Sequence, residues 1–168
     1  MSNKVLSICI PTYNRGQKLI GNLKKWLAND NHKFEIVISD NCSTDNTVEL
    51  LKSLGDERVV IIENDKNYGT HLNGIKVLQA GSGKYIMPLM DKDFISMEHI
   101  DEITDFLEKN DFAVGRFNDS CTNEKISFYK YPNKVNALRF FCFRGNHPSG
   151  FLLNRQLFHD KNVVDICA

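Results

Sequence analysis

The feature that most constrains the fold of this chain is an alternation of two hydrophobic periods over residues 4–115. Continuous apolar runs, which predict buried strands, alternate with segments whose apolar residues recur every three or four positions, as on one face of a helix. The runs are Val5–Ile10, Phe34–Ser39, Val59–Ile62 and Tyr85–Met90, and the helical stripes begin at Leu19, Val48, Leu72 and Ile100. Four strand-then-helix units predict an α/β fold, in which helices flank a mostly parallel sheet.

The chain after residue 115 has a different character, with more aromatic residues and asparagines. Short strands are predicted at Lys125–Tyr131 and Ser149–Leu153, and a helix is predicted to begin near Asn133. No repeat or linker divides the 168 residues, so we expect one domain over residues 1–168. Within it, residues 116–168 are expected to form a small lobe attached to the sheet.

Charge and cysteine usage exclude some classes of partner. The 21 Lys and Arg side chains balance 21 Asp and Glu side chains, so the chain lacks the basic excess that binding to nucleic acid usually leaves. The five cysteines are scattered without a C-x-x-C pair, which indicates a reducing, cytoplasmic compartment. Since no apolar stretch reaches the roughly 20 residues that span a bilayer, any membrane contact is expected to be peripheral.

The predicted sheet directs attention to the segments that follow its strands. Ligands of parallel α/β sheets bind beyond the carboxyl ends of the strands. Four polar segments are predicted there: Pro11–Arg15, Asp40–Asp45, Asn64–Asn73 and Asp91–Asp93. A ligand-binding site is therefore expected at this edge of the sheet.

Asp91-Lys92-Asp93 is a candidate metal site, because it directly follows the fourth apolar run. Two carboxylates two positions apart can point to one side, and hard oxygen ligands suit Mg²⁺ or Mn²⁺ with positions left for water and substrate phosphates. The alternative is an acidic turn that caps the next helix. The position at a strand end favours the metal site.

The segment Asp40–Asp45 offers one candidate ligand contact and several helix-start signals. Asp40, followed by Asn41, can accept a hydrogen bond from a base or from a ribose hydroxyl. Asp45 is interpreted instead as an acid that favours the N-terminus of the following helix, and either Ser43 or Thr44 is predicted to cap that helix.

The two remaining loops are each open to two interpretations. In Pro11-Thr12-Tyr13-Asn14-Arg15, the tyrosine can stack on a base and the arginine can reach a phosphate. Alternatively, the loop only connects a strand to a helix and binds no ligand. Asn67-x-Gly69-x-x-x-Asn73 can line a ligand site, or it can be a capped helix start without a ligand.

Taken together, these segments resemble family 2 glycosyltransferases with the GT-A fold. The matching text is LSICIPTYNR (6–15), EIVISDNCSTDNT (35–47), NDKNYGTHLNGI (64–75) and GKYIMPLMDKDF (83–94), in the order and spacing of that family. The forms S-D-N-x-S-T-D-x-T and N-x-G-x-x-x-N are closest to the branch that builds bacterial O-antigen and capsular polysaccharides. The resemblance implies a Rossmann-like nucleotide-sugar-binding part at residues 4–115 and a partial acceptor lobe at residues 116–168.

The resemblance also implies a role for each matching residue. Asp40 would hydrogen-bond the base, and Asp91 would approach the ribose or the sugar. Asp93, with Asp91, would hold the Mn²⁺ or Mg²⁺ that bridges the donor diphosphate. Lys92 departs from the branch, which usually has Asp there. The other residues of the expected donor site are Pro11, Thr12, Tyr13, Asn14, Arg15, Asn41, Asn67, Gly69, Asn73 and Lys92 itself.

The reaction implied by the resemblance is an inverting sugar transfer. A hydroxyl of a glycan or lipid-linked acceptor attacks the anomeric carbon, and a carboxylate takes its proton. The branch places this base beyond the acceptor lobe, where this chain has Asp160 and Asp165, and Asp160 is the candidate. The implied location is the cytoplasm, at the inner face of a bacterial plasma membrane.

The alternative is a truncated or degenerate module that binds a nucleotide-sugar with little turnover, because complete enzymes of this family usually carry a larger acceptor region.

Overall fold

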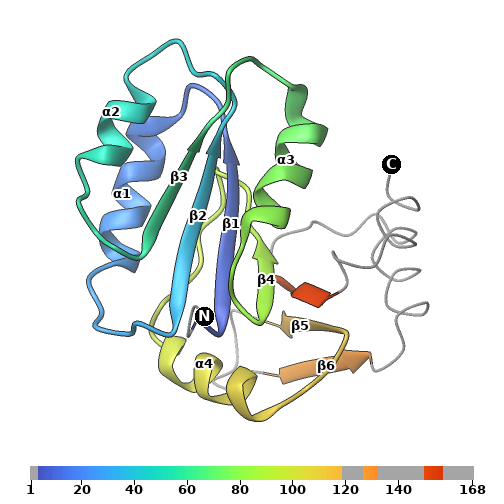
Figure 1. Cartoon of the computed structure of the whole chain (residues 1–168). Coiled ribbons are helices and arrows are strands. Elements are labelled where there is room, and N and C mark those ends of the chain that lie inside the picture. Colours follow the sequence, from blue (N-terminus) through green and yellow to red (C-terminus); the bar gives the residue numbers. More distant parts are fainter. Residues whose placement is uncertain (1–3, 119–126, 132–149, 157–168) are drawn as a thin grey trace.

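The computed structural model describes residues 4–118, 127–131 and 150–156, and the strands within them form one mixed sheet (Figure 1). The described strands are ordered β3-β2-β1-β4-β7-β5-β6. Four of them run parallel and overlap the four apolar runs of the sequence, as predicted: β1 (Leu6–Thr12), β2 (Phe34–Asp40), β3 (Val59–Glu63) and β4 (Tyr85–Pro88).

Each parallel strand is followed by a helix. Figure 1 shows the first two helices on one side of the parallel strands and the third on the other. The helices are α1 (Gly16–Trp26), α2 (Thr47–Lys52), α3 (Gly69–Ala80) and α4 (Ile100–Lys109). In the described part of the chain, none of the helices combines the length and the apolar character that crossing a membrane would need.

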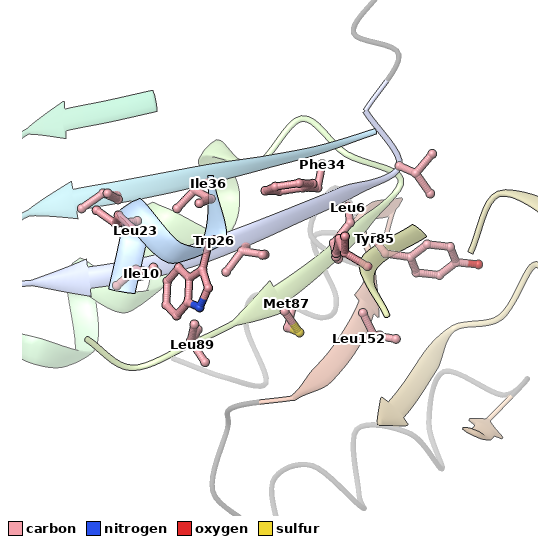
Figure 2. Close-up of a cluster of buried hydrophobic side chains, with 14 of the residues drawn as sticks. Leu6, Ile10, Leu23, Trp26, Phe34, Ile36, Tyr85, Met87, Leu89 and Leu152 are labelled. Atoms are coloured by element: carbon pink, nitrogen blue, oxygen red, sulfur yellow. The ribbon is translucent and has the colours of Figure 1, made fainter. Parts of the chain in front are cut away.

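The parallel strands separate two hydrophobic cores, because alternate side chains of a strand point to opposite faces of the sheet. Figure 2 shows the larger core, where Leu23 and Trp26 of α1 lie among strand residues such as Ile10 and Ile36. Ile100 and Leu107 of α4 belong to the same core. On the opposite face, Val77 of α3 packs with Cys9, Val37 and Ile86. Burial on both faces explains why β1, β2 and β4 read as continuous apolar runs, whereas β3, at the edge of the sheet, is only partly buried.

The described strands of the second half extend the same sheet with antiparallel pairing. β7 (Phe151–Asn154) pairs with both β4 and β5 (Val114–Asn118), and β5 pairs with β6 (Ser127–Tyr131). β6 and β7 overlap the two strands predicted from the sequence. The helix predicted near Asn133 and the candidate base Asp160 lie outside the described residues.

Candidate functional site

The carboxyl ends of the parallel strands bring the predicted segments to one edge of the sheet. Thr12 of β1 is paired with Asp40 of β2, and Asp40 is paired with Glu63 of β3. Beyond these pairs, the Asn41 N–H donates to the Thr12 carbonyl at 2.9 Å and the Asn64 N–H donates to the Asp40 carbonyl at 3.0 Å. The segments after β1, β2 and β3 therefore leave the sheet at the same level.

Asn14 joins the segment after β1 to the segment after β2. Its N–H donates to Ser43 Oγ at 2.8 Å, its Oδ1 accepts from the Thr44 N–H at 2.8 Å, and its Nδ2 donates to Thr44 Oγ1 at 3.2 Å. Asn14 has φ 52° and Cys42 has φ 62°, a left-handed conformation that residues other than glycine adopt rarely. Such residues gather at functional sites, where surrounding contacts hold them in place.

Asp40 is almost completely covered, with 2% of its surface exposed. The Ser43 N–H donates to Asp40 Oδ2 at 2.8 Å, and the Ser43 hydroxyl donates to Asp40 Oδ1. Both carboxylate oxygens are thus bound by one residue of the following loop.

The start of α2 corrects one prediction. The residue at its N-cap position is Asn46, so the expectation that Ser43 or Thr44 caps this helix is wrong. The physical reason is that their side chains bind Asp40 and Asn14 instead. Asp45 does serve the first turn, since its Oδ1 accepts from the Thr47 N–H at 3.0 Å.

Asn41 and Asn67 join the segments after β2 and β3. Asn41 Nδ2 donates to Asn67 Oδ1 at 2.9 Å, and Asn41 Oδ1 accepts from the Tyr68 N–H at 2.8 Å. Asn67 Oδ1 also accepts from the N–H of Gly69 at 2.8 Å. Gly69 has φ 79°, which a glycine adopts without strain, so the chain turns sharply into α3 at this point.

Asn73 lies below this edge in a buried polar network that the sequence did not reveal. It is 2% exposed. Its Oδ1 accepts from Ser39 Oγ at 2.7 Å and from Asn64 Nδ2 at 2.9 Å. Lys76 Nζ donates to Asn64 Oδ1 at 2.9 Å and lies 3.5 Å from the centroid of the Tyr68 ring. The helical spacing of Asn73 and Lys76, three residues apart, is a sequence signal that could have indicated a shared face. In this structure Asn73 holds α3 against β2.

Asp91 connects the segment after β4 to the segment after β1. Its Oδ2 accepts from Thr12 Oγ1 at 3.4 Å and forms an ion pair with Arg15 Nε at 3.4 Å, and its side chain is 13% exposed. Burial raises the pKa of the Asp91 carboxyl, and this is opposed by the positive charge of Arg15 and the hydrogen bond from Thr12. Thr12 and Arg15, both predicted as site residues, therefore each contact Asp91.

Asp93 and Lys92 follow in the same turn. The Asp93 N–H donates to the Met90 carbonyl at 2.9 Å, and the Asp93 carbonyl accepts from Asn22 Nδ2 at 3.4 Å. The side chain of Lys92 is exposed. The next helix, α4, begins only at Ile100, so this turn does not cap it. Metal binding by the two carboxylates stays a prediction from the sequence.

Tyr13 directly follows β1 and is 42% exposed. Pro11 lies two residues before it, in β1, whose last residue is Thr12. Within the described ranges, no three His, Cys, Asp or Glu side chains are grouped as a protein-only metal site would need.

Comparisons with known proteins agree with this architecture. The family described as Glycosyl transferase family 2 matches residues 7–163. The chain is 33% identical to the putative colanic acid biosynthesis glycosyl transferase WcaA of Escherichia coli K12, over 85% of this chain and 54% of WcaA. It is 24% identical to the putative teichuronic acid biosynthesis glycosyltransferase TuaG of Bacillus subtilis 168, over 65% of this chain and 44% of TuaG.

Solved structures share the fold. S. aureus TarS 1–349 in complex with UDP-GlcNAc superposes with a TM-score of 0.68 at 20% identity, covering 94% of this chain and 47% of TarS. The mannosyltransferase PcManGT of Pyrobaculum calidifontis, in complex with GDP-Man and Mn²⁺, gives 0.64 at 16% identity, covering 92% and 45%. The chain spans about half the length of these proteins. Its fold is the GT-A fold of glycosyltransferases, and the chain belongs to glycosyl transferase family 2.

Proposed function

We propose that this chain transfers a sugar from a nucleotide-sugar donor to a hydroxyl of a glycan or lipid-linked acceptor in bacterial surface polysaccharide synthesis. The observation that carries the proposal is the joining of the strand-end segments through Asn14, Asn41 and Asp91 at one edge of the sheet. The relatives named for colanic and teichuronic acid biosynthesis support the class of product. The neighbours bound to UDP-GlcNAc and GDP-Man support the class of donor.

The donor is proposed to lie across the segments after β1 and β2. The exposed ring of Tyr13 offers a stacking surface for the base. Asp40 accepts a hydrogen bond from the base. Arg15, which forms an ion pair with Asp91, is proposed to bind the diphosphate. Pro11, Thr12, Asn14, Asn41, Asn67, Gly69 and Lys92 complete the proposed donor site, and the buried Asn73 supports it by holding α3 against β2.

Asp91 and Asp93 are the residues proposed to hold Mn²⁺ or Mg²⁺. Their donor set fits, because such ions in nucleotide sites usually take one or two protein carboxylates and complete their coordination with water and substrate phosphates. When bound, the ion supplies positive charge at the diphosphate. Lys92 adds an exposed cation in the same turn.

The chemistry required of the chain's own residues is charge stabilisation and proton transfer. Arg15 stabilises the negative charge that develops on the departing nucleoside diphosphate. The acceptor hydroxyl attacks the anomeric carbon from the opposite face, which inverts its configuration, and a carboxylate within hydrogen-bond reach takes the proton. Asp160 is the proposed base, and the reaction is proposed to take place at the inner face of the plasma membrane.

A second function is a module that binds the nucleotide-sugar with little turnover. The observation that favours it is Lys92, a cation that stands between the two carboxylates in the sequence. Both functions require donor binding, and only the first requires release of the nucleoside diphosphate.

A thermal-shift screen of UDP-, GDP-, CDP- and dTDP-sugars with Mn²⁺ identifies the donor, because a ligand that binds the folded state raises its stability. Nucleoside diphosphate release from that donor is then measured with and without Mn²⁺. We expect Asp93→Ala to lower the metal-stimulated release by about 100-fold or more, while Asp45→Ala, which removes a carboxylate bound to α2, leaves it within about twofold. Donor binding without any metal-stimulated release would favour the binding module.

A further inference from the structure

Ser43 lies between the candidate base-binding residue and the segment after β1. Its Oγ accepts from the Asn14 N–H at 2.8 Å, and its hydroxyl donates to Asp40 Oδ1. A serine hydroxyl has one proton, and a backbone N–H can only donate. The bond from Asn14 therefore occupies a lone pair of Ser43 Oγ, and the Ser43 proton is directed to Asp40.

The backbone of Ser43 fixes the other oxygen of the same carboxylate. The Ser43 N–H donates to Asp40 Oδ2 at 2.8 Å. With one donor on each oxygen, rotation of the Asp40 carboxylate would break two hydrogen bonds. Only 2% of the surface of Asp40 is exposed, so the orientation of its remaining lone pairs decides which hydrogen bond it can accept.

We propose that Ser43 is a positioning residue that orients Asp40 to accept a hydrogen bond from a ring N–H of the donor's base. Uracil and thymine offer such a donor at N3 and guanine offers one at N1, whereas cytosine presents a lone pair at N3. Ser43 thereby favours uridine, thymidine or guanosine donors over cytidine donors. This inference rests on the proposed function, in which Asp40 contacts the base.

Thr44 provides a matched control in the same loop. Its Oγ1 accepts from Asn14 Nδ2 at 3.2 Å, so it also joins the segments after β1 and β2. The hydrogen bonds of the Asp40 carboxylate described above come from Ser43. Thr44→Val therefore weakens the connection between the loops while leaving the Ser43–Asp40 bonds in place.

The test is a calorimetric titration of UDP, GDP, dTDP and CDP, each with Mn²⁺, into the full chain and its variants. We expect Ser43→Ala to weaken the tightest-binding nucleotide about tenfold, the effect of losing a hydrogen bond to a carboxylate. The ratio of the affinity for that nucleotide to the affinity for CDP should fall by a similar factor. Ser43→Thr keeps the hydroxyl and should bind within about threefold of the wild type, as should Thr44→Val.

A double-mutant cycle separates positioning of Asp40 from a general effect on the loop. In the Asp40→Ala background, Ser43→Ala should change the affinity by less than about twofold, because its target is gone. Three results would each overturn the inference. The first is the same tenfold loss of affinity in the Asp40→Ala background. The others are equal losses of affinity in Ser43→Ala and Thr44→Val, or no loss in Ser43→Ala. If the wild type binds none of the four nucleotides, the proposed function itself fails. Melting temperatures of all variants confirm that they are folded.

Discussion

At the scale of single residues, Arg58 shows how this fold accommodates a buried charge. The residue is 5% exposed, and its Nη1 donates to the carbonyls of Asn29 and Asn31 at 2.7 and 3.2 Å. Nη2 donates to the Leu27 carbonyl at 2.7 Å and to Asp56 Oδ2 at 2.8 Å. These bonds compensate for the loss of hydration. Arg58 thus fixes the connection between α1 and β2 from the segment that leads into β3.

Asp56 makes this pair sensitive to acid. The side-chain hydrogen bond from Arg58 is the main cause that lowers the pKa of Asp56 to about 2, from 3.8. A carboxyl pKa lowered by folding stabilises the folded state above the unfolded value, and the contribution is lost as the pH falls through the folded value. We expect Asp56→Asn to lower the free energy of unfolding by about 1–2 kcal/mol at pH 7.

Urea denaturation at several pH values tests this expectation. The wild type should lose the contribution of Asp56 between about pH 4 and pH 2, so the two proteins should converge in that window. Glu63→Gln is the control, because the ion pair between Glu63 and Lys52 is at least half exposed and such pairs contribute about 1 kcal/mol at most. A difference between the wild type and Asp56→Asn that stays constant down to pH 2 would contradict the assignment.

At the scale of elements, the contact between α1 and α2 depends on Gly16. A Cβ at this position would lie 2.6 Å from the Cα of Thr47, which is backbone and cannot rotate away. The Gly16 N–H also donates to Thr47 Oγ1 at 2.9 Å. The close approach of these two helix starts holds the loops that carry Arg15 and Asp45 beside each other.

Gly16→Ala is therefore expected to destabilise the protein by about 1–3 kcal/mol, the usual cost of overpacking a tight contact. Gly21→Ala, in the same helix, is the control. A Cβ added at Gly21 would meet no heavy atom within 4 Å outside the turns of its own helix, and alanine is the better helix former, so this variant should be more stable by about 0.5–1 kcal/mol. Chemical denaturation of both variants gives the comparison. Equal effects in the two variants would show that α1 and α2 tolerate a wider separation.

The elements and the site differ in how far the sequence predicts them. The four parallel strands and their helices are predicted from the sequence, because β1, β2 and β4 are buried on both faces and leave continuous apolar runs. The edge strand β3 is only partly buried, but its residues are apolar as far as Ile62. The edge at which the site lies follows from the same topology. The partners of Ser43 and Thr44 were not predicted, since a hydroxyl that caps a helix and one that binds a neighbouring loop look alike in sequence. The burial of Asn73 depends on Ser39 and Asn64, which contact it only in the folded chain.

At the scale of the whole molecule, one sheet carries both the candidate site and the strands of the second half. β4 pairs with β1 on one side and with β7 on the other. The segment that contains Asp91 and Asp93 follows β4, so it begins where the parallel and antiparallel parts of the sheet meet. A ligand bound at this segment would lie beside the boundary between the parallel and the antiparallel strands that the structure describes.

The packing of Trp26 links the core to this segment. The chain has one tryptophan, and its Nε1 donates to the Ile95 carbonyl at 2.9 Å. Its ring centroid lies 6.2 Å from that of Phe94, the residue after Asp93. Indole emission depends on such contacts, so a change in the backbone at Phe94 and Ile95 will alter it.

We expect Mn²⁺ with a nucleoside diphosphate to change the emission intensity of Trp26 in a saturable titration, and Asp93→Ala to remove the part that depends on the metal. An emission spectrum that stays constant while calorimetry records binding would show that the segment after Asp93 does not respond. The buried indole of Trp26 thus provides an intrinsic fluorescent reporter of ligand binding near Phe94 and Ile95, without any added label.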